Sequence, residues 1–214
     1  MKNTIKYLIL LIIYLVCGVN LQAQNYTFRN VVMSDGLSGL LVNAIYKDSE
    51  GFVWLGTDNC LDRFDGVKVR HYEFRGVDSG RKKRVNCITE TADNQLWVGN
   101  GIGLWRLNRA NGQLERIVPE KIDFAVNTLL PDGDILYIGT EKGLFIQEDG
   151  QLLQVLTDRN MLAACNRIMD LCLNEDKSAL WLATVQGLFS YSLKDGKIDS
   201  WHFQENVPEA DYFR

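Results

Sequence analysis

Short apolar runs alternate with polar turn residues along nearly the whole chain. The runs are rich in Val, Ile, Leu, Trp, Tyr and Phe, and Asp, Asn, Gly and Ser separate them. This pattern is typical of β-strands joined by tight turns. In the first group of runs we expect strands at 42–47, 53–57, 61–65 and 69–74. No segment after the N-terminal stretch shows a sustained helical period with caps, so the pattern predicts an all-β protein.

The groups of runs are copies of one repeat. Each copy has an aromatic residue in its second strand, and successive aromatics are 43, 40 and 44 residues apart: Trp54, Trp97, Tyr137 and Trp181. Two glycine positions recur at fixed offsets from these aromatics: Gly56, Gly99 and Gly139, then Gly103, Gly143 and Gly187. Four strands in roughly 40–45 residues is the size of a β-propeller blade. We therefore predict blades of four antiparallel strands at about 40–75, 84–118, 125–156 and 166–204.

The repeated residues have a structural interpretation. Because a buried aromatic side chain removes roughly 150–250 Å² from water, we expect the four aromatics to pack between blades rather than to hold a ligand. Cys60 stands in the first copy where the other three have the later glycine. We expect that this one turn either needs no positive φ or tolerates the strain of one.

Several of these motifs together resemble the two-component regulator propeller repeats. They are Gly36-Leu37-Ser38, the Val-Asn start of the first strand, Trp-Leu-Gly-Thr and the closing Gly-Leu-aromatic. The resemblance covers about residues 25–200. It implies the periplasmic sensor part of a hybrid two-component system, a membrane histidine kinase that detects glycan fragments. In that family two seven-bladed propellers precede an immunoglobulin-like domain, a membrane helix and the kinase core. The resemblance therefore implies a sensor fragment without kinase activity of its own.

The first 23 residues have the features of a signal peptide. Lys2 and Lys6 precede a 13-residue apolar stretch, 7–19, and Leu21-Gln22-Ala23 follows. The stretch is shorter than the about 20 residues that span a bilayer. We expect cleavage after Ala23, export to the periplasm, and no membrane span in residues 24–214; an uncleaved anchor is the alternative. The intact family member would be anchored in the inner membrane.

Residues 24–214 amount to about four and a half blades, whereas closed propellers typically have 4–8. The segment 26–31 is interpreted as a lone strand before the first blade, and 205–214 as the lead-in to a fifth. We expect an incomplete ring belonging to a truncated or split sensor. A small closed propeller and a ring completed by another chain remain alternatives.

The net charge and the cysteine content limit the classes of partner and of metal site that we expect for this chain. Loss of residues 1–23 removes two lysines and no acid, so the formal net charge goes from −4 to −6. An acidic chain argues against nucleic acid as a partner. Four cysteines remain, and we expect free thiols, with one disulfide as the alternative: Cys60, Cys87, Cys165 and Cys172. His71 and His202 are isolated and the cysteines show no zinc spacing, so we predict neither a metal nor a cofactor.

No nucleophile–base arrangement is evident, and most carboxylates occupy hairpin turns, where Asp and Asn serve turn geometry. We therefore expect no catalytic residues and no enzyme.

Binding is better supported, because in a propeller the turns between second and third strands share one face with the loops between blades. The candidate ligand residues lie in these turns and loops: Asp58, Asn59, Arg84, Asn100, Glu141, Lys142 and Gln186. Such side chains suit sugar hydroxyls, and Arg84 suits an acidic sugar. The prediction is an oligosaccharide- or small-ligand-binding sensor, with the remaining blades or a second copy of the sensor as possible partners. The alternative is an exported propeller module that completes its ring with another chain, and a propeller lyase is the third hypothesis.

Overall fold

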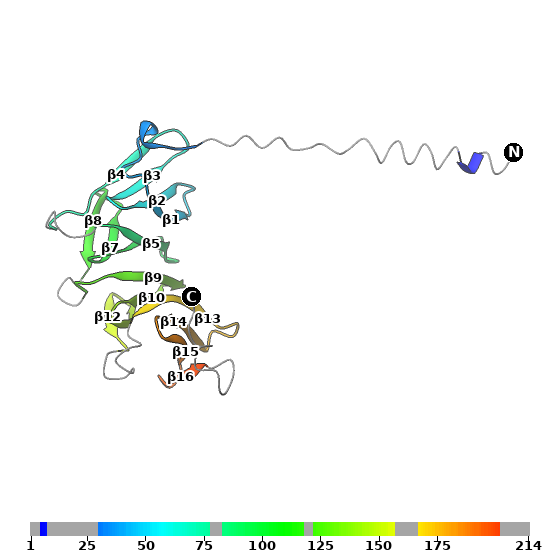
Figure 1. The fold of residues 1–214 in the computed structure, drawn as a ribbon, viewed down its shortest axis with the longest axis vertical. Coiled ribbons are helices and arrows are strands. Elements are labelled where there is room, and N and C mark those ends of the chain that lie inside the picture. Colours follow the sequence, from blue (N-terminus) through cyan, green and yellow to red (C-terminus); the bar gives the residue numbers. More distant parts are fainter. Residues whose placement is uncertain (1–4, 8–29, 78–82, 118–121, 157–166, 202–214) are drawn as a thin grey trace. The chain divides into compact units, whose positions relative to one another are not determined.

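The computed structural model describes residues 5–7, 30–77, 83–117, 122–156 and 167–201. The chain divides into two units, 1–30 and 31–214, and every strand belongs to the second (Figure 1). The expected signal peptide and the segment 26–31 fall mostly outside the described residues, and 205–214 falls wholly outside them. Within the described part, no helix has the length and apolar character needed to cross a membrane.

The strands form four antiparallel sheets, each of four strands paired in chain order. The first two sheets contain β1 (Val42–Lys47), β2 (Val53–Thr57), β3 (Leu61–Phe64), β4 (Val69–Tyr72), β5 (Val85–Glu90), β6 (Leu96–Asn100), β7 (Gly103–Asn108) and β8 (Gln113–Ile117). The last two contain β9 (Val126–Asp132), β10 (Ile135–Thr140), β11 (Gly143–Glu148), β12 (Gln151–Gln154), β13 (Ile168–Leu173), β14 (Ala179–Thr184), β15 (Gly187–Ser192) and β16 (Ile198–Trp201). The all-β prediction of four-stranded propeller blades is confirmed (Figure 1).

Successive blades meet along their first strands: β1 contacts β5, β5 contacts β9, and β9 contacts β13. A short 3-10 helix, η2 (Met33–Asp35), precedes the first blade. Between each pair of neighbouring blades lies one apolar cluster, which buries the second-strand aromatic of the earlier blade. Trp54, Trp97 and Tyr137 are almost completely buried in these clusters, so the interpretation of the aromatics as packing residues is confirmed for the first three blades.

The glycine two residues after each aromatic is required by the next blade. A Cβ atom on Gly56 would lie 2.5 Å from Val85 Cγ1, and one on Gly99 would lie 2.6 Å from Val126 Cγ1. Neither distance is compatible with van der Waals contact, because carbon atoms pack at about 3.5–4.0 Å. The repeat therefore keeps glycine where the first strand of the next blade approaches the backbone.

Polar side chains close the turns between the first and second strands, as the sequence pattern predicts. The buried carboxylate of Asp48 accepts hydrogen bonds from Phe52 N (2.8 Å) and Trp54 Nε1 (2.7 Å), so it closes the β1–β2 turn and orients the aromatic. In the second blade Thr91 takes this role and accepts from Trp97 Nε1 at 3.1 Å. These contacts confirm that such turn residues serve the geometry of the blade.

Candidate functional site

Every first strand begins with a β-bulge, where one extra residue is inserted against the second strand. The register shifts lie between 42 and 44, 85 and 87, 126 and 128, and 168 and 170. The inserted residues are Asn43, Asn86, Asn127 and Met169. A bulge turns a side chain out of the alternation of its strand. The bulges therefore present one side chain per blade at the same end of the first strands.

Two of these asparagines also join neighbouring blades. Asn86 Nδ2 donates to the carbonyl of Val126 (2.9 Å), and Asn127 Nδ2 donates to the carbonyl of Ile168 (2.8 Å). Each hydrogen bond fixes the amide plane against the start of the next first strand. The fold itself thus fixes these two amides, and groups that are already fixed lose little conformational entropy in any contact that they make.

The turns between second and third strands lie at the same end. Gly101 N donates to the carbonyl of Arg84 (3.2 Å), Glu141 N to that of Ala125 (3.1 Å), and Val185 N to that of Arg167 (3.3 Å). Each bond ties a turn to the residue that precedes a first strand. The prediction that these turns share one face with the inter-blade segments is confirmed.

A cavity of about 410 Å³ opens at this end of the first strands. Residues from all four blades line it: Asn43, Arg84, Asn86, Gly101, Ala125, Asn127, Glu141, Arg167 and Met169. We call it the axial cavity. Its volume lies within the range of about 300–1,000 Å³ that is usual for small-molecule sites. Two guanidinium groups, one carboxylate and three amides give it a polar lining with an excess of positive charge.

Of the seven candidate residues from the sequence, Arg84 and Glu141 line the axial cavity and the other five do not. Asn100 is completely buried, and its Oδ1 accepts from Ile102 N (3.0 Å) and Trp105 Nε1 (3.1 Å), so its side chain supports the turn. Asn59 Nδ2 donates to the carbonyl of Ser38 (2.8 Å) and holds the segment before β1 against the first blade.

The remaining three candidates lie on exposed turns. The ammonium group of Lys142 stands 4.8 Å from the ring centroid of Phe124, a cation–π contact. Asp58 and Gln186 are exposed at the β2–β3 and β14–β15 turns. Of the seven candidates, Asn59 and Asn100 therefore support the first and second blades, whereas Arg84 and Glu141 reach the axial cavity.

Sequence reasoning missed most of the cavity: the bulge asparagines, Ala125, Arg167 and Met169. A signal for the asparagines was present, because Val-Asn recurs at the start of the first three blades. That motif was used only as a mark of the repeat. The bulge that turns the asparagine toward the cavity comes from pairing between β1 and β2 and their counterparts, which no short sequence window shows.

Comparison with known proteins supports the resemblance that the repeats indicated. Residues 36–59 match the model of the two-component regulator propeller family. A segment of 79 residues, 37% of this chain, is 32% identical to histidine kinase P4 of Formosa agariphila. The chain spans only 6% of that kinase.

Solved structures show the same fold. The extracellular domain named for the hybrid two-component system BT3049 of B. thetaiotaomicron superimposes with a TM-score of 0.67 over 82% of this chain, at 21% identity. The extracellular domain of BT4673 from the same organism gives 0.65 over 80%, at 23% identity. This chain covers 26% and 23% of those two chains. Virginiamycin B lyase of Staphylococcus aureus gives 0.58 at 18% identity, a likeness of fold alone.

Proposed function

Because the chain carries the two-component regulator propeller repeat, we propose that it is the ligand-sensing part of a two-component sensor and that the axial cavity holds the ligand. The observation that carries the proposal is the convergence of four blades on one polar cavity. A ligand in this position would contact residues from several blades at once. Its binding energy would then act on the blades' relative positions, which is what a sensor needs in order to pass on a signal.

The lining favours an oligosaccharide with an acidic group. Amide groups from Asn43, Asn86 and Asn127 suit sugar hydroxyls, since an amide both donates and accepts. Arg84 and Arg167 are exposed guanidinium groups, which bind carboxylate and sulfate through paired donors. Glu141 offers a single acceptor of opposite charge. A uronic-acid or sulfated oligosaccharide therefore fits this lining better than a neutral one.

The test is a titration of the full chain with a panel of neutral, uronic-acid and sulfated oligosaccharides, followed by calorimetry and thermal unfolding. Arg84→Ala and Arg167→Ala should each weaken binding of the acidic ligand roughly 10-fold or more, because a hydrogen bond to a charged group contributes about 1.5–3 kcal/mol. Arg75→Ala is the matched control, since Arg75 is exposed after the outer strand β4 and does not line this cavity. No binding by any oligosaccharide, or equal losses in all three variants, would count against the proposal.

The proposed role is binding without chemistry, in the periplasm after export by residues 1–23, with the signal passed to a histidine kinase. Incubation of a bound oligosaccharide with the chain for a day should return it unchanged by chromatography. A changed product profile would instead favour the lyase hypothesis. Fractionation of cells that express the chain should find it in the periplasm, shortened by the leader.

One observation favours a second function, that of a module whose ring is completed by another chain. Ile45 on the first strand of the first blade is 72% exposed, whereas its counterpart Ile88 in the second blade is 9% exposed against the preceding blade. Light scattering of the chain would report a defined oligomer in this case, and Ile45→Asp should dissociate it. A monodisperse monomer would exclude assembly with a second copy.

A further inference from the structure

The first blade departs from the repeat at the start of its third strand. Cys60 stands where the other blades have Gly103, Gly143 and Gly187, and Asp62 stands where they have Trp105, Phe145 and Phe189. The three glycines have φ values of 144°, 115° and 123°, and Cys60 is not among the positive-φ residues of the described chain. Of the two expectations for this turn, the one without a positive φ is thus confirmed.

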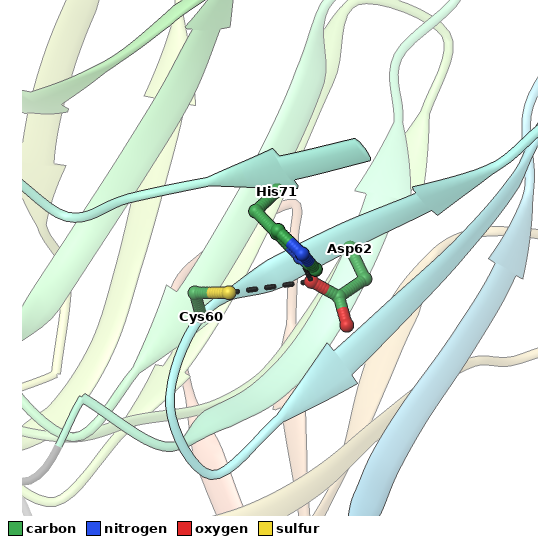
Figure 2. Close-up of side chains that lie close together, drawn as sticks. All are labelled: Cys60, Asp62 and His71. Carbon is green, nitrogen blue, oxygen red and sulfur yellow. Dashed lines mark hydrogen bonds and ion pairs between the residues drawn. The ribbon is translucent and has the colours of Figure 1, made fainter. Parts of the chain in front are cut away.

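The departures bring three metal-binding side chains together (Figure 2). Cys60 and Asp62 are two residues apart on an extended chain and so share one face. His71 on β4 pairs directly with Asp62 on β3. Asp62 Oδ1 lies 2.7 Å from His71 Nδ1 and 3.2 Å from Cys60 Sγ, and all three atoms lie within 4.8 Å of one another.

The carboxylate at the centre of the group is completely buried and is oriented from behind. Asp62 Oδ2 accepts hydrogen bonds from Ser38 N and Ser38 Oγ, both at 2.8 Å. These bonds leave Oδ1 directed toward the thiol and the imidazole. Metal-binding carboxylates are commonly held by such outer hydrogen bonds, which fix the ligand before the metal binds.

The fold itself does not require a carboxylate at this position. The equivalent Trp105 and Phe145 are 1% and 2% exposed and pack in apolar clusters between blades. Burying a carboxylate costs free energy unless hydrogen bonds or a cation compensate for the lost hydration. Hydrogen-bond contacts with Ser38, Cys60 and His71 compensate for the burial of Asp62. The feature that points to a ligand is the gathering of a carboxylate, a thiol and an imidazole at a position where the other blades have an aromatic.

We propose that Cys60 Sγ, Asp62 Oδ1 and His71 Nδ1 bind one zinc-type divalent cation, with the fourth position open to solvent beside His71. Thiolate, imidazole and carboxylate are the three ligand types of Zn²⁺, and three protein ligands with one open position form a common zinc arrangement. Mg²⁺ and Ca²⁺ prefer oxygen ligands only, so neither should compete. The His71 side chain is 46% exposed, which provides a route for the ion.

The geometry needs only a small adjustment. Metal–ligand bonds of about 2.0–2.3 Å at a tetrahedral angle place ligand atoms roughly 3.3–3.6 Å apart. Cys60 Sγ and His71 Nδ1 would each have to move away from Asp62 Oδ1 by less than about 1 Å, and these two atoms, which lie within 4.8 Å of one another, would have to settle at the same spacing. The thiolate is the form of cysteine that binds a metal, so the cation must displace the thiol proton of Cys60. Binding releases the thiol proton to solvent as the S–H bond gives way to the metal–sulfur bond. The Nδ1 proton of neutral His71, which faces the Asp62 carboxylate, moves to Nε2 through solvent so that Nδ1 can ligate the metal.

The sequence predicts no metal, because its cysteines lack zinc spacing and His71 is isolated in the chain. The three ligands are instead brought together by strand register, and His71 comes nine positions after Asp62 in the sequence. Without a metal, the same three groups would simply be a hydrogen-bonded cluster that holds Ser38 against the blade. The two arrangements differ in whether the thiol is deprotonated at neutral pH.

Cobalt is the decisive probe, because a Co²⁺–thiolate bond gives a strong near-ultraviolet charge-transfer absorption. Titration of the full chain with Co²⁺ should produce this band at one equivalent, and Zn²⁺ should abolish it while Mg²⁺ and Ca²⁺ do not. Cys60→Ser should remove the band. Cys172→Ser should retain it, since Cys172 is exposed on the fourth blade. No band in the wild-type chain, or a band that survives in Cys60→Ser, would overturn the proposal.

Two further variants keep the test independent of folding. His71→Gln changes a half-exposed side chain, so it should fold normally by circular dichroism and still lose the tight cobalt site. Ser38→Ala removes the Oγ hydrogen bond behind Asp62 but leaves all three ligands in place. It should weaken Zn²⁺ binding about 10–100-fold, the usual effect of losing an outer partner. Unchanged Zn²⁺ affinity in both folded variants would contradict the assignment.

Discussion

All four blades derive from one repeat, but the first three differ from the fourth on one face. This outgoing face is the one that, in the first three blades, packs against the next blade in chain order. In the first three, the second-strand aromatic is buried and the glycine two residues later lies against the next blade. In the fourth, Trp181 and Leu188 are only half-buried, and Cys172 is exposed. Ala183 takes the place of the glycine, and Met169 takes the place of the bulge asparagine.

This difference shows which features of the repeat belong to the blade and which belong to its neighbour. The order of the four strands and the bulge at the start of the first strand are the same in the fourth blade as in the others, so they are properties of the blade itself. The glycine and the asparagine change together. The glycines of the first three blades lie against the following first strand, and the asparagines of the second and third blades donate to it. They are therefore requirements of the interface between blades.

The largest difference in stability loss between the second and fourth blades is expected when the second-strand aromatic is replaced by alanine. Trp97→Ala should lower the free energy of unfolding by about 3–5 kcal/mol, since it empties a buried site between the second and third blades. Trp181→Ala should cost clearly less, because Trp181 is half-buried. Urea unfolding of the full chain measures both. Equal losses would show that the fourth blade's outgoing face is packed as tightly as the others.

Exchange of glycine and alanine at this position should cost more stability in the second blade than in the fourth. Gly99→Ala places a methyl group against Val126 and should destabilise the chain by about 1–3 kcal/mol, the usual cost of overpacking. Ala183→Gly relieves no clash, so it should cost only the roughly 0.5–1 kcal/mol by which glycine weakens a strand. The denaturation midpoints of the two variants test this. A stable Gly99→Ala protein would mean that the blades can move apart without loss.

A smaller effect is expected at the bulges. Asn86→Ala removes the hydrogen bond to Val126 and should cost about 0.5–1.5 kcal/mol. Met169→Ala is the matched change on the fourth blade and should cost less than about 0.5 kcal/mol, because Met169 is exposed and makes no inter-blade amide bond. Thermal unfolding of the two variants measures this difference in stability. If Asn86→Ala also weakened oligosaccharide binding, the axial cavity would gain direct support.

The two thiols report the same contrast without perturbing stability. Burial raises the pKa of the Cys87 thiol to about 12, so its thiolate fraction at pH 8 is very small, and it grows only as the pH approaches that value. Cys172 is exposed. Iodoacetamide at pH 8 should modify Cys172 well before Cys87, as read by peptide mass spectrometry. Equal rates would indicate that the second and third blades separate readily.

Much of the fold could be predicted because the repeat is a local signal. Alternating runs around Trp54, Trp97, Tyr137 and Trp181 specify strands within a few residues, and the spacing specifies the blade. The residues of the candidate site were harder to predict from the sequence. Glu141 was found because its turn repeats, and Arg84 because it directly precedes a first strand. Asn100 was mistaken for a surface residue, but it is buried beneath its own turn.

The sequence by itself determined the blades, since strand and turn preferences act over a few residues and the pattern occurs four times. Only the tertiary structure decided which side chains meet. Asn86 reaches the cavity because a bulge reorients it, and His71 reaches Cys60 and Asp62 because β4 pairs with β3 in one register. Pairing between strands depends on backbone hydrogen bonds over distances that no local sequence pattern encodes, and a shift of one residue would turn His71 to the opposite face.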